Sequence, residues 1–426
     1  PARILEPALA EATFDSAWSI IHRTFWDTAF NGVDWQGTRE ELRPRARAAR
    51  TDAELRGIIQ GMLDRLRMSH LVVIPGDAAE ALAAPRDEGP PAEPGNAGLE
   101  LRWVDDALLV TRVLPGGAAE AAGVRPGWTL ESAGEMTEAR IRQALARLPA
   151  AADPRRFASY ASQAMEGALE GAAGDTVRAR FHDGEGRAVD AALVLRQPEG
   201  RMATLGNLPP ILARVETERV PLGDGREVGI IRFPIWLPAI APELDRAVDA
   251  LRGTAGIVVD IRGNPGGLGV MAPGFAGHFM DRRDTLGTMI TRRDVMHLVV
   301  NPRRVSPDAR PVAPFAGPVA VLVDERSAST SEFFAGGMQA LGRARVFGVT
   351  SAGQALPSLM PRLPNGDVML HAMADFVGPD GERWEGAGVV PDVQAPPARG
   401  ALLAGRDPAL ESAVAWIRST AGASPR

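Results

Sequence analysis

The sequence predicts a multidomain α/β protein with a helical segment at its N-terminus. The chain has 426 residues, more than a single hydrophobic core usually holds. Residues 8–70 carry apolar side chains at helical spacing, whereas residues 200–400 alternate short β-branched runs with helical patterns. Between these parts, residues 76–97 are rich in Pro, Ala and Gly, which is typical of a linker.

Two apolar stripes predict the helices of the N-terminal segment. One stripe lies within residues 14–25 and contains Phe14 and Trp18, and the other lies within residues 55–66. The Asn-Gly pair at residues 31–32 predicts a turn between them, and Asp34 is placed to start the next helix. We therefore expect a small helical domain that ends at Ser69 and His70.

The middle of the chain predicts a β-rich domain. Its expected strands are residues 99–103, 108–114, 177–181 and 191–195, and its expected helices are residues 118–122 and 138–148.

Farther along the chain, apolar runs at residues 228–233, 257–261 and 319–323 are nearly continuous, as in strands buried on both faces. A further strand is expected at residues 345–347, and helical patterns lie between these runs. This alternation predicts a partly parallel sheet, and the Asn-Gly pair at residues 365–366 predicts a hairpin.

Composition excludes several kinds of chemistry. There are no cysteines, so the chain can use neither a thiol nucleophile nor a disulfide framework. All 47 basic residues are arginine, which excludes a lysine base or a Schiff base. The net charge of −6 suggests no nucleic-acid partner, and no apolar run approaches the roughly 20 residues that span a bilayer.

Two turns are the best candidates for chemistry. Residues 324–332 read Asp-Glu-Arg-Ser-Ala-Ser-Thr-Ser-Glu where a predicted strand passes into a helix, and residues 261–267 read Ile-Arg-Gly-Asn-Pro-Gly-Gly directly after another strand. The serines could cap the helix with Glu332 as the capping-box partner, and the glycines could form an ordinary turn. Together at one sheet edge, however, the turns would supply a nucleophile and an oxyanion hole for acyl transfer.

These motifs resemble the C-terminal processing (tail-specific) serine peptidases, including the tricorn protease core. The segment Glu-Gly-Ala-Gly-Val-Val-Pro-Asp at residues 385–392 is similar to the closing motif of that family. Residues 115–127 resemble part of the PDZ domain that such enzymes carry. The resemblance implies four segments: a helical domain, a linker, a PDZ-like domain and an α/β catalytic domain of ClpP/crotonase-like fold, at residues 1–75, 76–97, 98–198 and 199–426.

The family resemblance also implies site residues. The middle serine of the serine-rich turn, Ser329, would be the nucleophile. The oxyanion hole would use the amide of Thr330 and that of Gly266 or Gly267. Many family members place a lysine base where this chain has Gln354.

The tricorn-like branch instead uses a histidine preceded by a serine on the helical domain, which corresponds here to His70 and Ser69. The acid of that branch falls on Glu385. Ser69 and Glu385 would orient the imidazole of His70. Two alternatives stay open: Ser69 and His70 would simply end a helix, or Gln354 would mark a catalytically inactive family member that binds peptides or acts as a scaffold.

Other residues are given structural roles. Asp260 and Arg262 are expected to pair or to brace the glycine turn, and His371 is expected to be structural. Trp236 would line a cleft or pack in the core. No spacing of carboxylates and histidines indicates a metal, and no cofactor is expected.

The resulting expectation is a serine endopeptidase acting on protein or peptide substrates, with C-terminal processing as one form of that activity. The family is commonly exported in bacteria, so a periplasmic or extracellular location is expected. The absence of cysteine permits export, and a chain that starts at Pro1 without Met or a signal-like run fits either a removed leader or a trimmed sequence.

Overall fold

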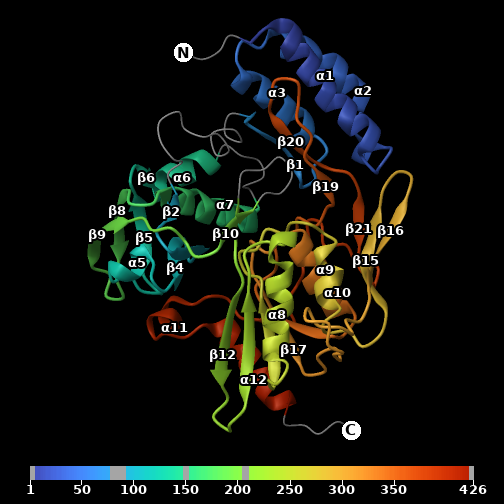
Figure 1. The fold of residues 1–426 in the computed structure, drawn as a ribbon. Coiled ribbons are helices and arrows are strands. Elements are labelled where there is room, and N and C mark those ends of the chain that lie inside the picture. The colour runs from blue at the N-terminus through green and yellow to red at the C-terminus, as the bar shows by residue number, and fades with distance from the viewer. Residues whose placement is uncertain (1–4, 77–92, 147–152, 204–210, 422–426) are drawn as a thin grey trace.

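The computed structural model describes residues 5–76, 93–146, 153–203 and 211–421. Figure 1 shows three regions: N-terminal helices at one end, a β-rich unit at one side, and a larger α/β unit that carries the C-terminus. Most of the predicted linker, residues 77–92, and the end of the helix predicted at 138–148 lie outside the described residues. No helix among the described residues is long and apolar enough to cross a membrane.

Three helices form the N-terminal region, and the two predicted apolar stripes lie on the first and the third of them. They are α1 (Pro7–Thr24), α2 (Trp35–Ala48) and α3 (Asp52–Asp64), with a short turn of 3₁₀ helix, η1 (Phe30–Gly32), after α1. The predicted start of α2 is confirmed, because the Asp34 carboxylate accepts a hydrogen bond from Gly37 N at 2.8 Å. Phe14, Ile21 and Leu55 are fully buried among these helices.

A strand that the sequence did not predict joins this region to the α/β unit. Strand β1 (Leu71–Ile74) pairs antiparallel with β20 (Val368–Ala372), which also pairs with β19 (Ser358–Leu359). The buried side chains of Leu363 and Met369 belong to the same core as the helices. The N-terminal helices are therefore packed against a hairpin from the far end of the chain, and that hairpin contains the predicted Asn-Gly turn.

The β-rich unit, residues 93–196, is built around a sheet with the strand order β3-β4-β5-β8-β9. Its strands are β2 (Pro94–Asn96), β3 (Leu99–Val104), β4 (Ala107–Val113), β5 (Thr129–Ala133), β6 (Met136–Thr137), β7 (Glu170–Ala172), β8 (Thr176–His182) and β9 (Ala188–Val194). Strand β2 lies within the stretch predicted as a linker. The helices are α5 (Ala118–Ala121), α6 (Glu138–Leu145) and α7 (Pro154–Gly167), the last of which was not predicted.

The α/β unit confirms the predicted, partly parallel sheet. Its strands are β12 (Glu216–Pro221), β13 (Glu227–Arg232), β14 (Gly256–Asp260), β17 (Val319–Val323), β18 (Ala344–Gly348) and β22 (Val393–Gln394), in that spatial order. All neighbouring pairs are parallel except β12 with β13. Alternate residues of the strands enter two different cores, so the central strands are covered on both faces.

Helices cover the two faces of this sheet. They are α8 (Ala241–Leu251), α10 (Thr330–Ala340) and α12 (Pro408–Thr420), with a 3₁₀ turn, η3 (Pro238–Ile240), before α8. Helix α9 (Met271–Ala276) packs against α10, and α11 (Arg399–Leu403) lies against the β-rich unit. A second sheet consists of β16 (Val295–Val300), β15 (Asp284–Ile290) and β21 (Asp375–Val377), and β10 (Arg201–Ala203) pairs with β11 (Ile211–Ala213). The hairpin of β15 and β16 projects toward the N-terminal helices (Figure 1).

Candidate active site

The two turns singled out in the sequence lie side by side at one edge of the parallel sheet. Strands β14 and β17 are parallel neighbours, with Asp260 opposite Leu322, so the turns that follow them leave the same edge. A Cβ atom added to Gly266 would lie 2.7 Å from the Cβ of Ser329. Gly266 also has a φ of 104°, a conformation that side chains rarely adopt. Only glycine therefore permits the two turns to approach this closely.

Among the serines of its turn, Ser329 has the hydroxyl best placed for chemistry. Ser327 and Ser331 are completely buried. The Ser327 hydroxyl donates to the Ile261 carbonyl at 2.8 Å, and the Ser331 hydroxyl donates to the Asn264 carbonyl at 2.9 Å. Ser331 also accepts a hydrogen bond from the indole of Trp236 at 2.9 Å, whereas Ser329 is partly exposed. Ser327 and Ser331 thus hold the serine-rich turn against the glycine turn through hydrogen bonds.

The backbone of Ser329 is strained. Its φ of 52° and ψ of −116° lie outside the regions favoured by residues with a side chain. Such strain persists only where the surroundings hold the residue in place, and it is concentrated at functional sites. Two contacts hold it here, because Ser329 N lies 2.9 Å from the Gln354 carbonyl and 3.0 Å from Glu332 Oε2.

Glu332, expected as a capping partner, also organises the loop beside the serine-rich turn. Its buried carboxylate accepts hydrogen bonds from Ser351 Oγ at 2.6 Å, Gly353 N at 2.8 Å and Gln354 N at 3.0 Å. Burial raises the pKa of Glu332 to about 7, although each of these donors favours the ionised form. One side chain therefore fixes residues 351–354 against Ser329.

We expect the substitution Glu332→Ala to destabilise the protein strongly. It would leave the Ser351 hydroxyl and the amides of Gly353 and Gln354 without this acceptor, which corresponds to a loss of about 3 kcal/mol or more in the free energy of unfolding. Urea unfolding would measure the loss. The matched control is Glu411→Ala, whose side chain is 47% exposed and should change the stability by less than about 0.5 kcal/mol. Equal stability of the two variants would contradict this role of Glu332.

The backbone amides near Ser329 differ in their availability. Gly266 N donates to Asn264 Oδ1 at 3.0 Å, so this amide is used within its own turn. Within the described residues, the amides of Gly267 and Thr330 have no acceptor. A Cβ atom on Gly267 would lie 2.3 Å from the Trp236 carbonyl oxygen, so this position also requires glycine. Of the two glycines predicted for an oxyanion hole, Gly267 has the freer amide.

Ser69, His70 and Glu385 come together from distant parts of the chain. The Ser69 amide donates to Glu385 Oε1 at 2.8 Å, and the Ser69 hydroxyl donates to Glu385 Oε2 at 2.8 Å. The same hydroxyl lies 2.8 Å from Nδ1 of His70. A hydroxyl can donate only one hydrogen bond, and that of Ser69 goes to the carboxylate, so Ser69 Oγ accepts a hydrogen bond from Nδ1–H of His70. This leaves Nε2 of His70 with a free lone pair.

This chain of hydrogen bonds reaches Ser329 through two consecutive residues. The Gln354 carbonyl accepts from Ser329 N, and the next amide, Ala355 N, donates to Glu385 Oε2 at 3.0 Å. The alternative that Ser69 and His70 end a helix is wrong, because α3 ends at Asp64. His70 instead precedes β1 with a φ of 56°, another strained backbone.

Burial determines the protonation of this group. It lowers the pKa of His70 to about 4, and the charge of Arg156 contributes in the same direction. Burial also raises the pKa of Glu385, against the hydrogen bonds from Ser69 and Ala355. His70 is therefore neutral at pH 7 and able to accept a proton.

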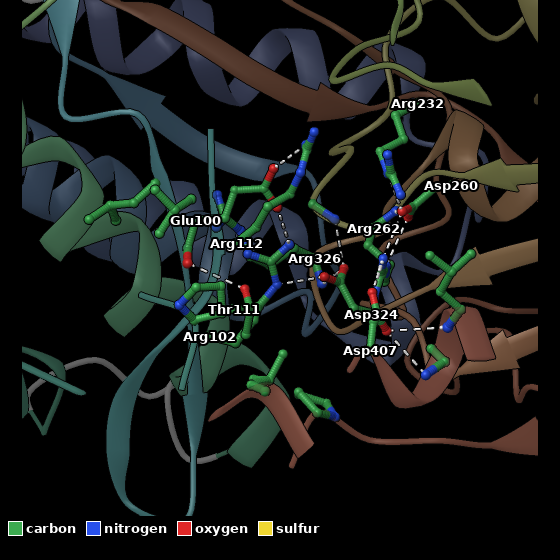
Figure 2. A pocket seen from close by; sticks show the side chains of 18 of the residues that line it. Glu100, Arg102, Thr111, Arg112, Arg232, Asp260, Arg262, Asp324, Arg326 and Asp407 are labelled. Carbon is green, nitrogen blue, oxygen red and sulfur yellow. Dashed lines mark hydrogen bonds and ion pairs between the residues drawn. The ribbon is translucent and has the colours of Figure 1, made fainter. Parts of the chain in front are cut away.

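A charged crevice of about 680 Å³ lies behind the serine-rich turn at residues 324–332, between the β-rich and α/β units. Figure 2 shows the ion pairs on its walls. The buried Arg102 of β3 contacts Asp324 at 2.6 Å, and Asp324 in turn accepts from Gly263 N at 2.8 Å. Arg102 and Asp324 thus support both turns, although Ser329 does not line this crevice.

The structure also shows where the residues that were given structural roles lie. Asp260 pairs with Arg262 at 2.7 Å, as predicted. Trp236 is fully buried, so it packs in the core and does not line a cleft. His371 is buried in β20 opposite Leu71, which fits its expected structural role. Gln354 uses its backbone for the contacts with Ser329 and Glu332.

A parallel α/β sheet with a strained serine beside a glycine turn defines a hydrolase of the serine-nucleophile class. Comparison with known proteins makes this specific. Residues 227–395 match the model of peptidase family S41, and residues 8–64 match that of the tricorn protease C1 domain. The chain therefore carries a domain of peptidase family S41, a family of serine peptidases, which confirms the family predicted from the motifs.

Two curated relatives cover most of the chain. The chain is 24% identical over 406 residues to the chloroplastic carboxyl-terminal-processing peptidase 3 of Arabidopsis thaliana, covering 92% of this chain and 70% of the relative. It is 26% identical over 418 residues to the putative tricorn protease homolog 2 of Streptomyces coelicolor, covering 94% of this chain and 31% of that protein.

Among solved structures, the photosystem II D1 C-terminal processing protease matches with a TM-score of 0.57 at 21% identity, covering 92% of this chain and 96% of that one. This likeness establishes the multidomain α/β fold of the family.

Proposed function

We propose that the protein is a serine endopeptidase in which Ser329 is the nucleophile and His70 is the general base. The observation that carries this proposal is the hydrogen-bonded chain from Glu385 through Ser69 to His70, which joins residues 316 positions apart. An aligned imidazole with a free Nε2 is what a serine nucleophile requires. A chain with no lysine needs such a base.

The reaction would proceed through an acyl-enzyme. Ser329 Oγ attacks the carbonyl carbon of the scissile bond while its proton passes to Nε2 of His70. The oxyanion would bind the amides of Thr330 and Gly267, with Gly266 shaping the turn. The imidazolium then gives its proton to the leaving amine. In the second step His70 takes a proton from water, which attacks the acyl-enzyme ester, and then returns that proton to Ser329 Oγ. Ser69 and Glu385 would stabilise the imidazolium through Nδ1–H.

The second candidate is an inactive family member that binds peptides, which the presence of Gln354 favours. The contacts of Gln354 with Ser329 and Glu332 are made by its backbone and need no particular side chain. A fluorophosphonate probe separates the two candidates, since it labels only an activated serine. We expect labelling of Ser329, found by mass spectrometry. No labelling of a folded protein would favour the binding protein.

The proposal includes a PDZ-like role for the β-rich unit, in which an extended peptide adds to the edge strand β3. On that edge, Leu101 N now donates to the Glu166 carboxylate at 2.9 Å, so an added strand would displace Glu166. C-terminal processing and export to the periplasm or exterior are parts of the same proposal, suggested by the C-terminal processing relatives and by the lack of cysteine.

The pH dependence follows from the burial of the histidine. Because the pKa of His70 is lowered and that of Glu385 is raised, kcat/KM should fall only well below pH 6.5, with an apparent pKa that belongs to the pair. Arg156→Ala should shift the acidic limb of this pH profile to higher pH, since the charge of Arg156 lowers the pKa of both His70 and Glu385. A limb near pH 6.5 in the wild type, unchanged in the variant, would contradict this electrostatic account.

A further inference from the structure

Helix α7 of the β-rich unit reaches the loops of the candidate site. Its first turn is fixed by Asp153, whose carboxylate accepts from Arg155 N at 2.8 Å, and by Pro154 at the first helical position. Arg155 and Arg156 therefore leave the helix in defined directions. Arg156 influences the pKa values of His70 and Glu385, whereas Arg155 contacts the backbone around them.

The guanidinium of Arg155 binds three carbonyl oxygens from two separate loops. Nη1 donates to Ala387 O at 2.7 Å and to Ser351 O at 3.1 Å, and Nη2 donates to Gly386 O at 2.6 Å. A Cβ atom on Gly388 would lie 2.8 Å from Nη1, so the second loop approaches the guanidinium as closely as glycine allows.

Both loops carry residues of the candidate site. Gly386 directly follows Glu385, whose carboxylate holds Ser69. The Ser351 hydroxyl donates to Glu332 at 2.6 Å and accepts from Val389 N at 2.6 Å. Arg155 thus holds, by their backbones, the loop that orients His70 and the loop that supports Ser329.

We infer that Arg155 is a positioning residue, which fixes Glu385 relative to Ser329 without contacting the reacting atoms. The inference rests on the proposed peptidase function. The planar guanidinium can donate to several carbonyls at once in a fixed geometry, which the ammonium of lysine cannot reproduce. The β-rich unit would then serve catalysis directly, because the alignment of the site would depend on an arginine that this unit supplies.

Arg399 provides a matched control. It lies at the start of α11 in the α/β unit, and its Nε and Nη2 donate to Gly127 O at 3.1 Å and Asp183 O at 2.6 Å of the β-rich unit. Arg399 therefore makes the same kind of bond between the same two units. Its acceptors belong to neither of the two loops that Arg155 binds.

The test is steady-state kinetics on the full-length wild type and on Arg155→Ala, Arg155→Lys and Arg399→Ala, with a thermal melt of each. We expect Arg155→Ala to lower kcat at least about tenfold while KM changes less than about threefold, because a displaced relay slows chemistry more than binding. Arg155→Lys should fall between wild type and alanine, and Arg399→Ala should keep kcat within about twofold.

Wild-type kcat in a folded Arg155→Ala protein would overturn the inference, as would an equal loss in Arg399→Ala. If Arg155→Ala does not fold, Arg155→Lys decides: a folded lysine variant with lowered kcat supports the positioning role, and one with wild-type kcat overturns it. Failure of the proposed function is distinguishable, because the wild type itself would then neither cleave peptides nor react with a fluorophosphonate.

Discussion

Ser329→Ala is expected to abolish peptide cleavage, with a loss of at least about 10³-fold in kcat, while the protein stays folded. The substitution removes the attacking oxygen. It leaves the two contacts of Ser329 N with Gln354 and Glu332, which hold the turn. Cleavage of an unfolded protein substrate would measure the activity, and a thermal melt would verify the fold.

Ser419→Ala, in the partly exposed last turn of α12, is the control and should have wild-type activity. Undiminished cleavage by Ser329→Ala would exclude Ser329 as the nucleophile. Ser327 and Ser331 would then have to be tested, although their hydroxyls already donate hydrogen bonds to backbone carbonyls.

The second large effect is expected from His70→Ala, again a loss of at least about 10³-fold in kcat, because no other base is aligned by Ser69 and Glu385. Gln354→Ala should lower kcat by less than about fivefold, since an amide is no base and the backbone contacts persist. The pair separates two mechanisms, because Gln354 occupies the position where many relatives carry lysine. An active His70→Ala protein beside an inactive Gln354→Ala protein would contradict the tricorn-like mechanism.

The sheet and the local shape of the site were readable from the sequence for physical reasons. Strands such as β14 are continuous β-branched runs, a pattern that only a doubly covered strand tolerates. The glycines of residues 263–267 indicated a close approach of backbones, which the position of Gly266 beside Ser329 confirms.

Features that depend on long-range contacts were not readable. The pairing of β1 with β20 joins Leu71 to His371, and no local pattern specifies that partner. Helix α7 was missed because its buried face is mostly alanine and serine, which gives a weak apolar stripe. Arg155 is one of many arginines in a chain without lysine, so only its three carbonyl contacts distinguish it.

The grouping of Ser69, His70 and Glu385 was predictable from the sequence only in part. The sequence suggested it through family resemblance alone, since nothing local to Ser69 points to Glu385. Its geometry adds what the resemblance did not contain: the direction of each proton in the chain of hydrogen bonds, and the link through Gln354 and Ala355 to Ser329.

The most direct test of the central claim is a crystal structure of the protein after reaction with a fluorophosphonate. The account predicts phosphorus bonded to Oγ of Ser329, with Nε2 of His70 within about 3 Å of that oxygen. It also predicts that a phosphonyl oxygen faces the amides of Gly267 and Thr330. A phosphonylated Ser329 with another base in hydrogen-bonding reach, or with Ser69 and Glu385 separated from His70, would contradict the account.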